Sequence, residues 1–175
     1  MAELILRPDE VVAMGSWDPS VDAAIIAILG DPEDTNTVYN TTQNQSMQLA
    51  FADIPEEYEA ETFTSITATI NARTGGRGAA TTTVKILDGF VEVVSTNTTI
   101  NTVGIAAYTT ALGDISSMSL ERINDLQFYM IGTAGTQAWY QDVWFTLTYT
   151  GAAATPVQGV KLSSGKLVLT GKVTF

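Results

Sequence analysis

The acidic side chains of the N-terminal third are the residues that come nearest to a metal site. Asp31, Glu33, Asp34 and Asp53 could offer oxygen ligands to Ca²⁺, a hard cation that takes six to eight carboxylate and carbonyl oxygens. Their spacing matches no calcium-binding loop, and with so many ligands required a solvated acidic turn is the better interpretation. We therefore expect neither a bound metal nor a cofactor.

A second acidic group raises the question of glycoside hydrolysis, which needs two carboxyl groups that face each other across a cleft. Glu56, Glu57, Glu59 and Glu61 are one or two residues apart, so they cannot face each other and are better interpreted as a solvated run. Histidine and cysteine are absent, which removes the commonest general base and the thiol nucleophile. The sequence predicts no catalytic residues and no enzyme.

Large aromatic side chains are the remaining candidates for a binding site. Trp17, Trp139, Tyr140 and Trp144 could form a platform for sugar rings. A large aromatic residue in a strand is more often part of a core or of a protein interface, where aromatic residues are enriched. The glycine-rich stretch at 75–78 is interpreted as a flexible loop, since it lacks the lysine, serine or threonine ending and the following helix of a phosphate loop.

The net charge of −11 is unevenly distributed. Residues 1–61 hold 13 acids and one base, which gives −12, while residues 62–175 hold 6 acids and 7 bases, which gives +1. Binding to nucleic acid needs clustered lysine and arginine, and binding to anionic membranes needs positive charge as well, so the sequence predicts neither partner. The opening residues lack a basic segment followed by a long apolar run, so we expect no signal peptide.

These side chains must be positioned by strands, and the clearest strand covers residues 138–150. Val143, Phe145, Leu147 and Tyr149 alternate with polar residues and Trp144, which predicts one face toward a core. Six more strands are expected from alternation or turn signals, at 47–51, 62–72, 81–87, 90–95, 105–112 and 126–131. The sequence predicts an all-β fold, an antiparallel β-sandwich that is jelly-roll-like.

Local signals complete the expected organisation. Asp88 and Gly89 predict a tight hairpin, and Ser20 or Asp22 is expected to cap a short helix that runs through Leu29 and ends at Gly30. A second helical turn is expected at 119–124, capped by its serine. We predict an N-terminal arm at 1–16, a jelly-roll sandwich at 17–151 and a C-terminal extension at 152–175 that contains a small basic hairpin. Within the arm, Leu4 to Leu6 could also be a short strand that Arg7-Pro8 stops.

Short motifs give the chain a resemblance to a known group. They are Arg7-Pro8, Gly15-Ser16-Trp17, Leu29-Gly30-Asp31, Asp34-Thr35 before Val38-Tyr39, Pro55 before a strand that ends in Ala72-Arg73, Val84-Lys85, Tyr108-Thr109, Leu147-Thr148-Tyr149-Thr150 and the trailing Gly165-Lys166-Leu167-Val168-Leu169-Thr170-Gly171. On these motifs the chain resembles tailed-bacteriophage structural proteins with small jelly-roll domains. The resemblance implies a non-enzymatic virion component that assembles in the host cytoplasm.

Three functional hypotheses follow. The first is a capsid decoration or cement protein that self-associates, as a homotrimer, and clamps the major capsid protein. Its expected interface comprises Leu4, Leu6, Trp17, Tyr129, Ile131, Trp144, Leu167, Leu169 and Phe175. The second is a glycan- or receptor-binding module of a phage head or tail fibre, which a row of coplanar aromatic rings around Trp139, Tyr140 or Trp144 would favour. A third hypothesis, a carboxylate-based, metal-dependent hydrolase, would need a clustered acidic cleft. The alternation of Leu167, Leu169, Val173 and Phe175 resembles the last strand of an outer-membrane barrel. Without a signal peptide we do not expect such a barrel.

Overall fold

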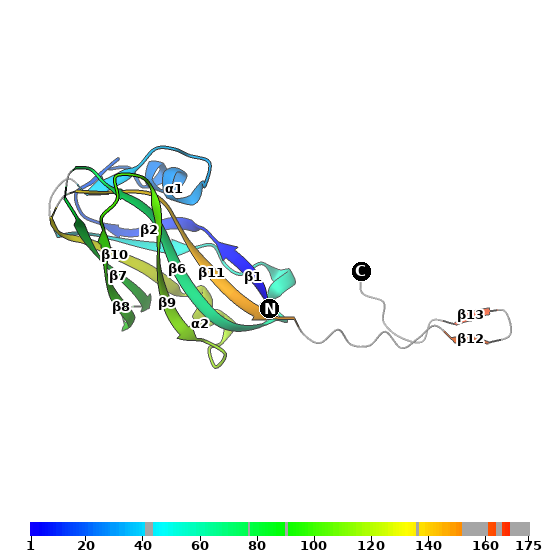
Figure 1. Ribbon diagram of the computed structural model, residues 1–175. Helices are drawn as coiled ribbons and strands as arrows, with labels where there is room; N and C mark the ends of the chain where they lie inside the picture. The colour runs from blue at the N-terminus through cyan, green and yellow to red at the C-terminus, as the bar shows by residue number, and fades with distance from the viewer. Residues whose placement is uncertain are drawn as a thin grey trace.

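The computed structural model describes residues 1–40, 44–76, 78–89, 91–135, 137–151, 161–163 and 166–168. Its body is an antiparallel β-sandwich with jelly-roll-like topology, as predicted (Figure 1). Sheet A contains β1 (Ala2–Leu6), β3 (Trp17–Asp18), β4 (Val38–Asn40), β6 (Thr62–Thr74), β9 (Ala106–Asp114) and β11 (Ala138–Thr150). Sheet B contains β2 (Pro8–Met14), β5 (Gln45–Phe51), β7 (Ala80–Asp88), β8 (Val91–Ile100) and β10 (Leu126–Gly135).

Strand β11 lies at the centre of sheet A, and its bounds match the prediction. It pairs with β6 along one edge and with β1 and β4 in succession along the other. Val143, Phe145 and Leu147 are buried between the sheets, while Trp144 points to the outer face. The predicted alternation is therefore confirmed for this strand. A register shift between Tyr140 and Asp142 changes which residues point outward: Trp139 does so before the shift, and Asp142 and Trp144 do so after it.

Sheet B provides the opposing layer of the core. Its order is β2-β5-β10-β7-β8, with every pair antiparallel. Met47, Leu49, Ile86, Phe128 and Met130 point inward and are fully buried. The hairpin prediction is confirmed, because Asp88 pairs with Val91 and Gly89 has a φ of 60°, a left-handed backbone that favours glycine.

The segment at 1–16, predicted as an arm, is instead part of both sheets. β1 pairs with β11 from Ala2 to Leu6, and β2 then pairs with β5. Leu6 is 5% exposed and belongs to the core. The physical reason is that Leu4 and Leu6 present one apolar side, which the sandwich buries against β11, and the chain crosses between the sheets at Arg7 and Pro8.

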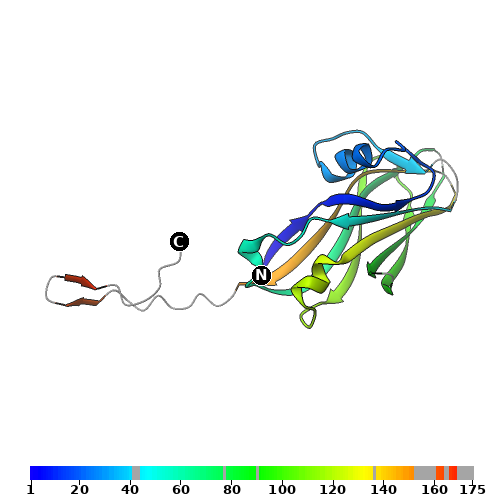
Figure 2. The ribbon, with the colours of Figure 1, turned by 180° about the vertical axis from the view of Figure 1, so that it is seen from behind.

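The helices are short and lie at the ends of the sandwich (Figures 1 and 2). α1 (Asp22–Gly30) packs beside β2 and β11 and buries Ile25, Ile28 and Leu29. Its end at Gly30 is as predicted, but the cap is not: the N-cap residue is Val21, and no side chain caps the helix. In α2 (Leu120–Asn124) the Ser119 side chain accepts a hydrogen bond from the Arg122 N–H, so the predicted cap is confirmed.

Near the C-terminus, β12 (Lys161–Ser163) pairs with β13 (Lys166–Val168), which agrees with the predicted hairpin. Of the interface residues predicted there, Leu167 lies in β13, and Leu169 and Phe175 fall outside the described residues. Val173, part of the barrel pattern, falls outside them too. None of the helices described above is long and apolar enough to cross a membrane.

Candidate binding face

The face of sheet A that points away from the core carries polar and aromatic side chains. On β11, Trp139, Asp142 and Trp144 point to this face, and Tyr39 of β4 lies directly opposite Trp139. Most other outward side chains on β6 and β9 are short and polar or small, namely Ser65, Thr67, Thr69, Asn71, Ala107, Thr109 and Ala111, and on β1 the outward side chains are Glu3 and Ile5, of which Ile5 is 51% exposed. We call this surface the outer face of sheet A.

One row of side chains crosses four strands of this face. Asp18 on β3 is opposite Tyr39 on β4, Tyr39 is opposite Trp139 on β11, and Trp139 is opposite Arg73 on β6. Such directly opposed residues are the closest neighbours in a sheet. We call these four residues the aromatic row. It exists because the strands from four separate parts of the chain align in this register.

Within the aromatic row each side chain contacts the next. The Tyr39 hydroxyl donates a hydrogen bond to the Asp18 carboxylate, and this bond raises the pKa of Tyr39 above its ordinary value. The rings of Tyr39 and Trp139 stack with centroids 5.6 Å apart and planes 26° apart. On the other side of the indole, the Arg73 guanidinium carbon lies 4.3 Å from the ring centroid, a cation–π contact.

The Trp139 indole is also held along its edge. Its Nε1–H donates to the Gln137 side-chain oxygen at 3.2 Å, and Gln137 in turn donates to the Asn40 carbonyl at 2.9 Å. A Cβ atom at Gly75 would lie 2.6 Å from the indole Nε1, closer than real contacts allow. Only glycine therefore fits beside this indole. The row is consequently preorganised, with both ring faces of Trp139 occupied and its outer edge half-exposed.

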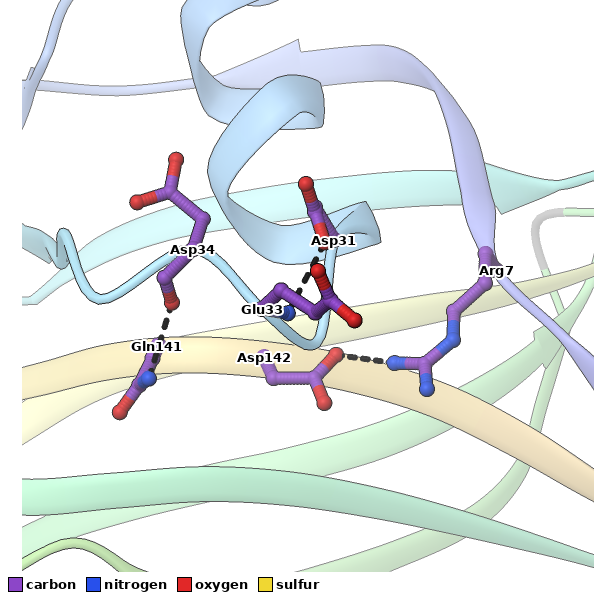
Figure 3. Close-up of polar contacts among 6 residues, drawn as sticks. All are labelled: Arg7, Asp31, Glu33, Asp34, Gln141 and Asp142. Atoms are coloured by element: carbon purple, nitrogen blue, oxygen red, sulfur yellow. Dashed lines mark hydrogen bonds and ion pairs between the residues drawn. The ribbon is translucent and has the colours of Figure 1, made fainter.

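A second cluster lies further along the same face, where β1 and β4 meet the same edge of β11 (Figure 3). Figure 3 shows the ion pair of Arg7 with Asp142. The Arg7 guanidinium carbon also lies 5.2 Å from the centroid of the Trp144 ring. Asp142 is 3% exposed, so the ion pair compensates a carboxylate that is nearly out of solvent. Thr69, opposite Trp144 on β6, is 5% exposed although it points outward, so neighbouring side chains cover it.

The acidic residues that were considered as Ca²⁺ ligands do not gather into one group. In the loop after α1, Asp31 accepts a hydrogen bond from the Glu33 N–H and Asp34 accepts from Asn36, while the Asp34 carbonyl accepts from Gln141 (Figure 3). The contacts of the Asp31 and Asp34 carboxylates are turn contacts within the loop, and the bond from Gln141 joins the loop to β11. Across the residues with described placement, no three acidic side chains gather in a group that could hold a metal ion.

The glutamate run also matches its solvated interpretation. Glu56 begins a short 3-10 turn that ends at Tyr58, and the side chains of Glu56, Glu57 and Glu59 are exposed. Adjacent residues of one surface turn do not face each other across a cleft, so this run lacks the arrangement that glycoside hydrolysis requires.

The structure separates the predicted aromatic residues into two groups. Trp139 and Trp144 share the outer face of sheet A, whereas Trp17 and Tyr140 are core residues that pack on each other with centroids 5.7 Å apart. Tyr140 is fully buried, which raises its pKa to about 12 despite a hydrogen bond with Thr82. Trp17 and Tyr140 therefore take no part in an aromatic platform, and for these two residues the preferred interpretation, that large aromatic residues in strands belong to a core or an interface, is confirmed as core.

Other predicted interface residues have mixed positions. Leu6 and Trp17, 5% and 2% exposed, are sealed in the core and offer no side-chain surface to a second copy. Leu4 is half-buried against the core. Tyr129 and Ile131 are half-buried on the outer face of sheet B, with Lys85 and Thr83 of β7 opposite them.

Tyr39, Arg73 and Arg7 occur in the motifs of the sequence analysis, but no part in a binding face was predicted for them. Alternation along 62–74 does put Arg73 on the same side as Asn71 and Thr69, so its face was readable. Its contact with Trp139 was not, since the contact depends on the pairing of β6 with β11, and Arg73 and Trp139 are 66 positions apart in the sequence.

Comparison with known proteins gives structural likenesses only. No protein-family model matches the chain, and no curated protein sequence matches it. The C-terminal CBM6 of LamC, a marine laminarinase from Zobellia galactanivorans, aligns with a TM-score of 0.43 at 8% identity and covers 84% of this chain and 99% of its own. The carbohydrate-binding module CBM6cm-2 from Cellvibrio mixtus lichenase 5A, in complex with cellotriose, aligns with 0.45 at 11% identity, covering 84% and 97%.

A carbohydrate-binding module CBM36 in complex with calcium and xylotriose aligns with a TM-score of 0.35 at 15% identity, covering 86% of this chain and all of its own. All three scores are below 0.5. The fold class, an antiparallel β-sandwich, is established by the sheets of this chain itself. We base the proposal for function on this chain's own side chains.

Proposed function

We propose that the chain is a non-enzymatic glycan-binding module and that the outer face of sheet A is its binding face. The observation that carries the proposal is the position of Trp139 and Trp144 on one face of one strand, with Tyr39 stacked nearly parallel on Trp139. A sugar ring has apolar C–H surfaces that pack on aromatic groups and hydroxyls that take hydrogen bonds. This face offers both kinds of contact.

The spacing favours a chain of sugars over a single ring. Trp139 and Trp144 are five residues apart on β11, which corresponds to on the order of 15 Å along an extended strand. Asn71 lies between them on β6, opposite Asp142, and supplies an amide, while Thr67 and Thr109 supply hydroxyls. Since Tyr39 and Arg73 occupy the two ring faces of Trp139, the ligand contacts the outward edge of the aromatic row and runs toward Trp144.

Preorganisation supports the same proposal. The Trp139 indole is fixed by Tyr39, Arg73, Gln137 and Gly75 before any ligand arrives. A side chain that is already ordered loses little conformational entropy on binding, so more of the contact energy is retained as affinity. If Trp139 served only to fill the core, these contacts on the outer face of the sheet would not be needed.

The test is affinity electrophoresis or a glycan array with Trp139→Ala and Trp144→Ala. We expect each variant to lose roughly fivefold to tenfold or more in affinity, in line with about 1 kcal/mol for an aromatic contact. Tyr129→Ala is the matched control, because Tyr129 is an equally half-buried aromatic residue on the outer face of sheet B. Retention of glycan binding by both tryptophan variants, or loss only in the control, would refute the proposal.

A second candidate is the capsid decoration protein that self-associates as a trimer on the major capsid protein of a virion. It is favoured by Tyr129 and Ile131, which remain half-buried on the outer face of sheet B, and by Val91 on β8, which is 68% exposed. Apolar side chains on an open sheet face are suited to a protein partner. Analytical ultracentrifugation and a binding assay with mature phage heads test it: a stable monomer that does not bind heads would exclude it.

A further inference from the structure

The guanidinium of Arg73 differs from the other basic groups of the sandwich in its partners. The sandwich has four basic side chains with described placement, Arg7, Arg73, Lys85 and Arg122. Arg7 pairs with Asp142, Lys85 with Glu92 and Arg122 with Asp88. Arg73 makes no ion pair with any described acid, and its contact is the indole of Trp139. An acidic chain that neutralises its other described cations thus keeps one positive group on the proposed binding face.

The Arg73 guanidinium carbon lies 4.3 Å from the centroid of the Trp139 ring, and none of the described residues accepts a hydrogen bond from the guanidinium. A guanidinium that stacks on an indole uses its flat face, while its N–H groups point outward in the plane of the group. This planar fork matches a carboxylate with two parallel hydrogen bonds. The stack on Trp139 also orders the long side chain in advance, which lowers the entropy cost of binding an anion.

Two acids on the strands of the outer face of sheet A are already engaged, while Asp31, Glu33 and Asp34 lie in the loop that Gln141 of β11 contacts. Asp142 pairs with Arg7, and Asp18 accepts the Tyr39 hydroxyl at the far end of the aromatic row. Asp18 is three strand spacings from Arg73, roughly 14 Å at about 4.8 Å per spacing. That separation exceeds the screening length of about 8 Å at physiological ionic strength, so Asp18 does little to repel an anion at Arg73.

We propose that the glycan bound at the outer face of sheet A carries a carboxylate, as in a uronic acid, and that Arg73 binds this group. The inference rests on the proposed glycan-binding function and adds the class of sugar. The carboxylate receives the two N–H groups of Arg73, and the sugar ring lies across the outer edge of Trp139. Asn71, two residues from Arg73 on the same strand and face, supplies an amide to the hydroxyls.

The test compares a uronate oligosaccharide, oligogalacturonate, with the same oligosaccharide after chemical reduction of its carboxyl groups. Isothermal titration of the full chain should give at least tenfold tighter binding of the acidic form. In Arg73→Gln that preference should disappear while the reduced form still binds, since the glutamine amide keeps a flat group beside Trp139. Trp139→Ala should weaken binding of both forms. Arg122→Gln, which removes a cation from the sandwich away from this face, is the matched control and should keep the preference.

The outcomes separate the two proposals. If wild type binds both forms equally, or Arg73→Gln keeps the preference for the acid, the carboxylate inference is overturned and the glycan-binding proposal remains. If wild type binds neither form nor any other glycan on an array, the proposed function itself fails. A polyglutamate peptide is the last probe: binding as tight as that of the uronate would show that charge alone is read, which also overturns the inference.

Discussion

At the scale of single residues, the proposed binding face depends on the contacts that hold Trp139 in place. Gly75 leaves room for the indole, because any Cβ there would lie 2.6 Å from Nε1. The aromatic ring itself is only one part of the site. Tyr39 and Arg73 contact the ring and fix its position. We therefore expect a substitution beside the ring to weaken glycan binding as much as a substitution of Trp139 itself.

Gly75→Ala should therefore displace the indole and weaken glycan binding about as much as Trp139→Ala. We expect the near-ultraviolet circular dichroism of the tryptophans to change while the thermal midpoint shifts by only a few degrees. Gly104→Ala is the control, since a Cβ there meets nothing within 4 Å. Unchanged binding and an unchanged tryptophan signal in Gly75→Ala would contradict this assignment.

The ion pair of Arg7 with the nearly buried Asp142 predicts a stability effect. Asp142→Asn keeps the shape but removes the charge opposite Arg7, and we expect urea unfolding to give about 1–3 kcal/mol lower stability. Asp88→Asn breaks the more exposed pair with Arg122 and should cost less than about 1 kcal/mol. Equal costs for the two variants would argue against a special role of the Arg7 pair.

At the scale of elements, alternation predicted most of the strands, but it did not predict which strands are neighbours. The apolar positions of β5, β6, β7, β10 and β11 were readable because each strand buries one face and side chains alternate with period two. For β1 both a short strand and an arm were open, and its place in sheet A was not predicted, since a short stretch before Arg7-Pro8 carries no signal for a partner more than a hundred residues away. The binding face was partly hidden for the same reason.

The pairing of β1 with β11 can be tested directly. Removal of residues 1–6 should leave the edge of β11 uncovered and remove Leu6 from the core, at a cost of several kcal/mol. We expect a much lower thermal midpoint or aggregation through the exposed edge. Removal of Met1 alone, which is 98% exposed, should have no effect. A truncated chain as stable as wild type would mean that residues 1–6 behave as an arm after all.

At the scale of the whole molecule, the stacked core couples stability to alkaline pH through Tyr140. An unfolded tyrosine ionises near pH 10, whereas burial raises the pKa of Tyr140 in the folded state to about 12. Between these values the unfolded state holds fewer protons, so the free energy of unfolding decreases as pH rises. The contribution is complete below pH 10, and about 2 kcal/mol is lost by pH 12.

Tyr140→Phe provides the comparison for this pH effect. The variant should lose about 1–2 kcal/mol at neutral pH, because the Thr82 hydroxyl loses its buried partner. Its stability should then fall less steeply than that of wild type between pH 10 and 12 in urea titrations. Parallel curves for the two proteins would show that Tyr140 is not the group responsible.

The register of β11 also fixes the direction in which the molecule can be held. Ala2 pairs with Tyr149 at one end of this strand, while Tyr39 pairs with Trp139 at the other, roughly 30–40 Å away (Figure 1). The first and the last strand residues of the sandwich therefore lie next to each other at the same end of the molecule. A fused domain or a biotin can be attached at this end of the sandwich. Trp139 then lies at the opposite end, away from the attachment point.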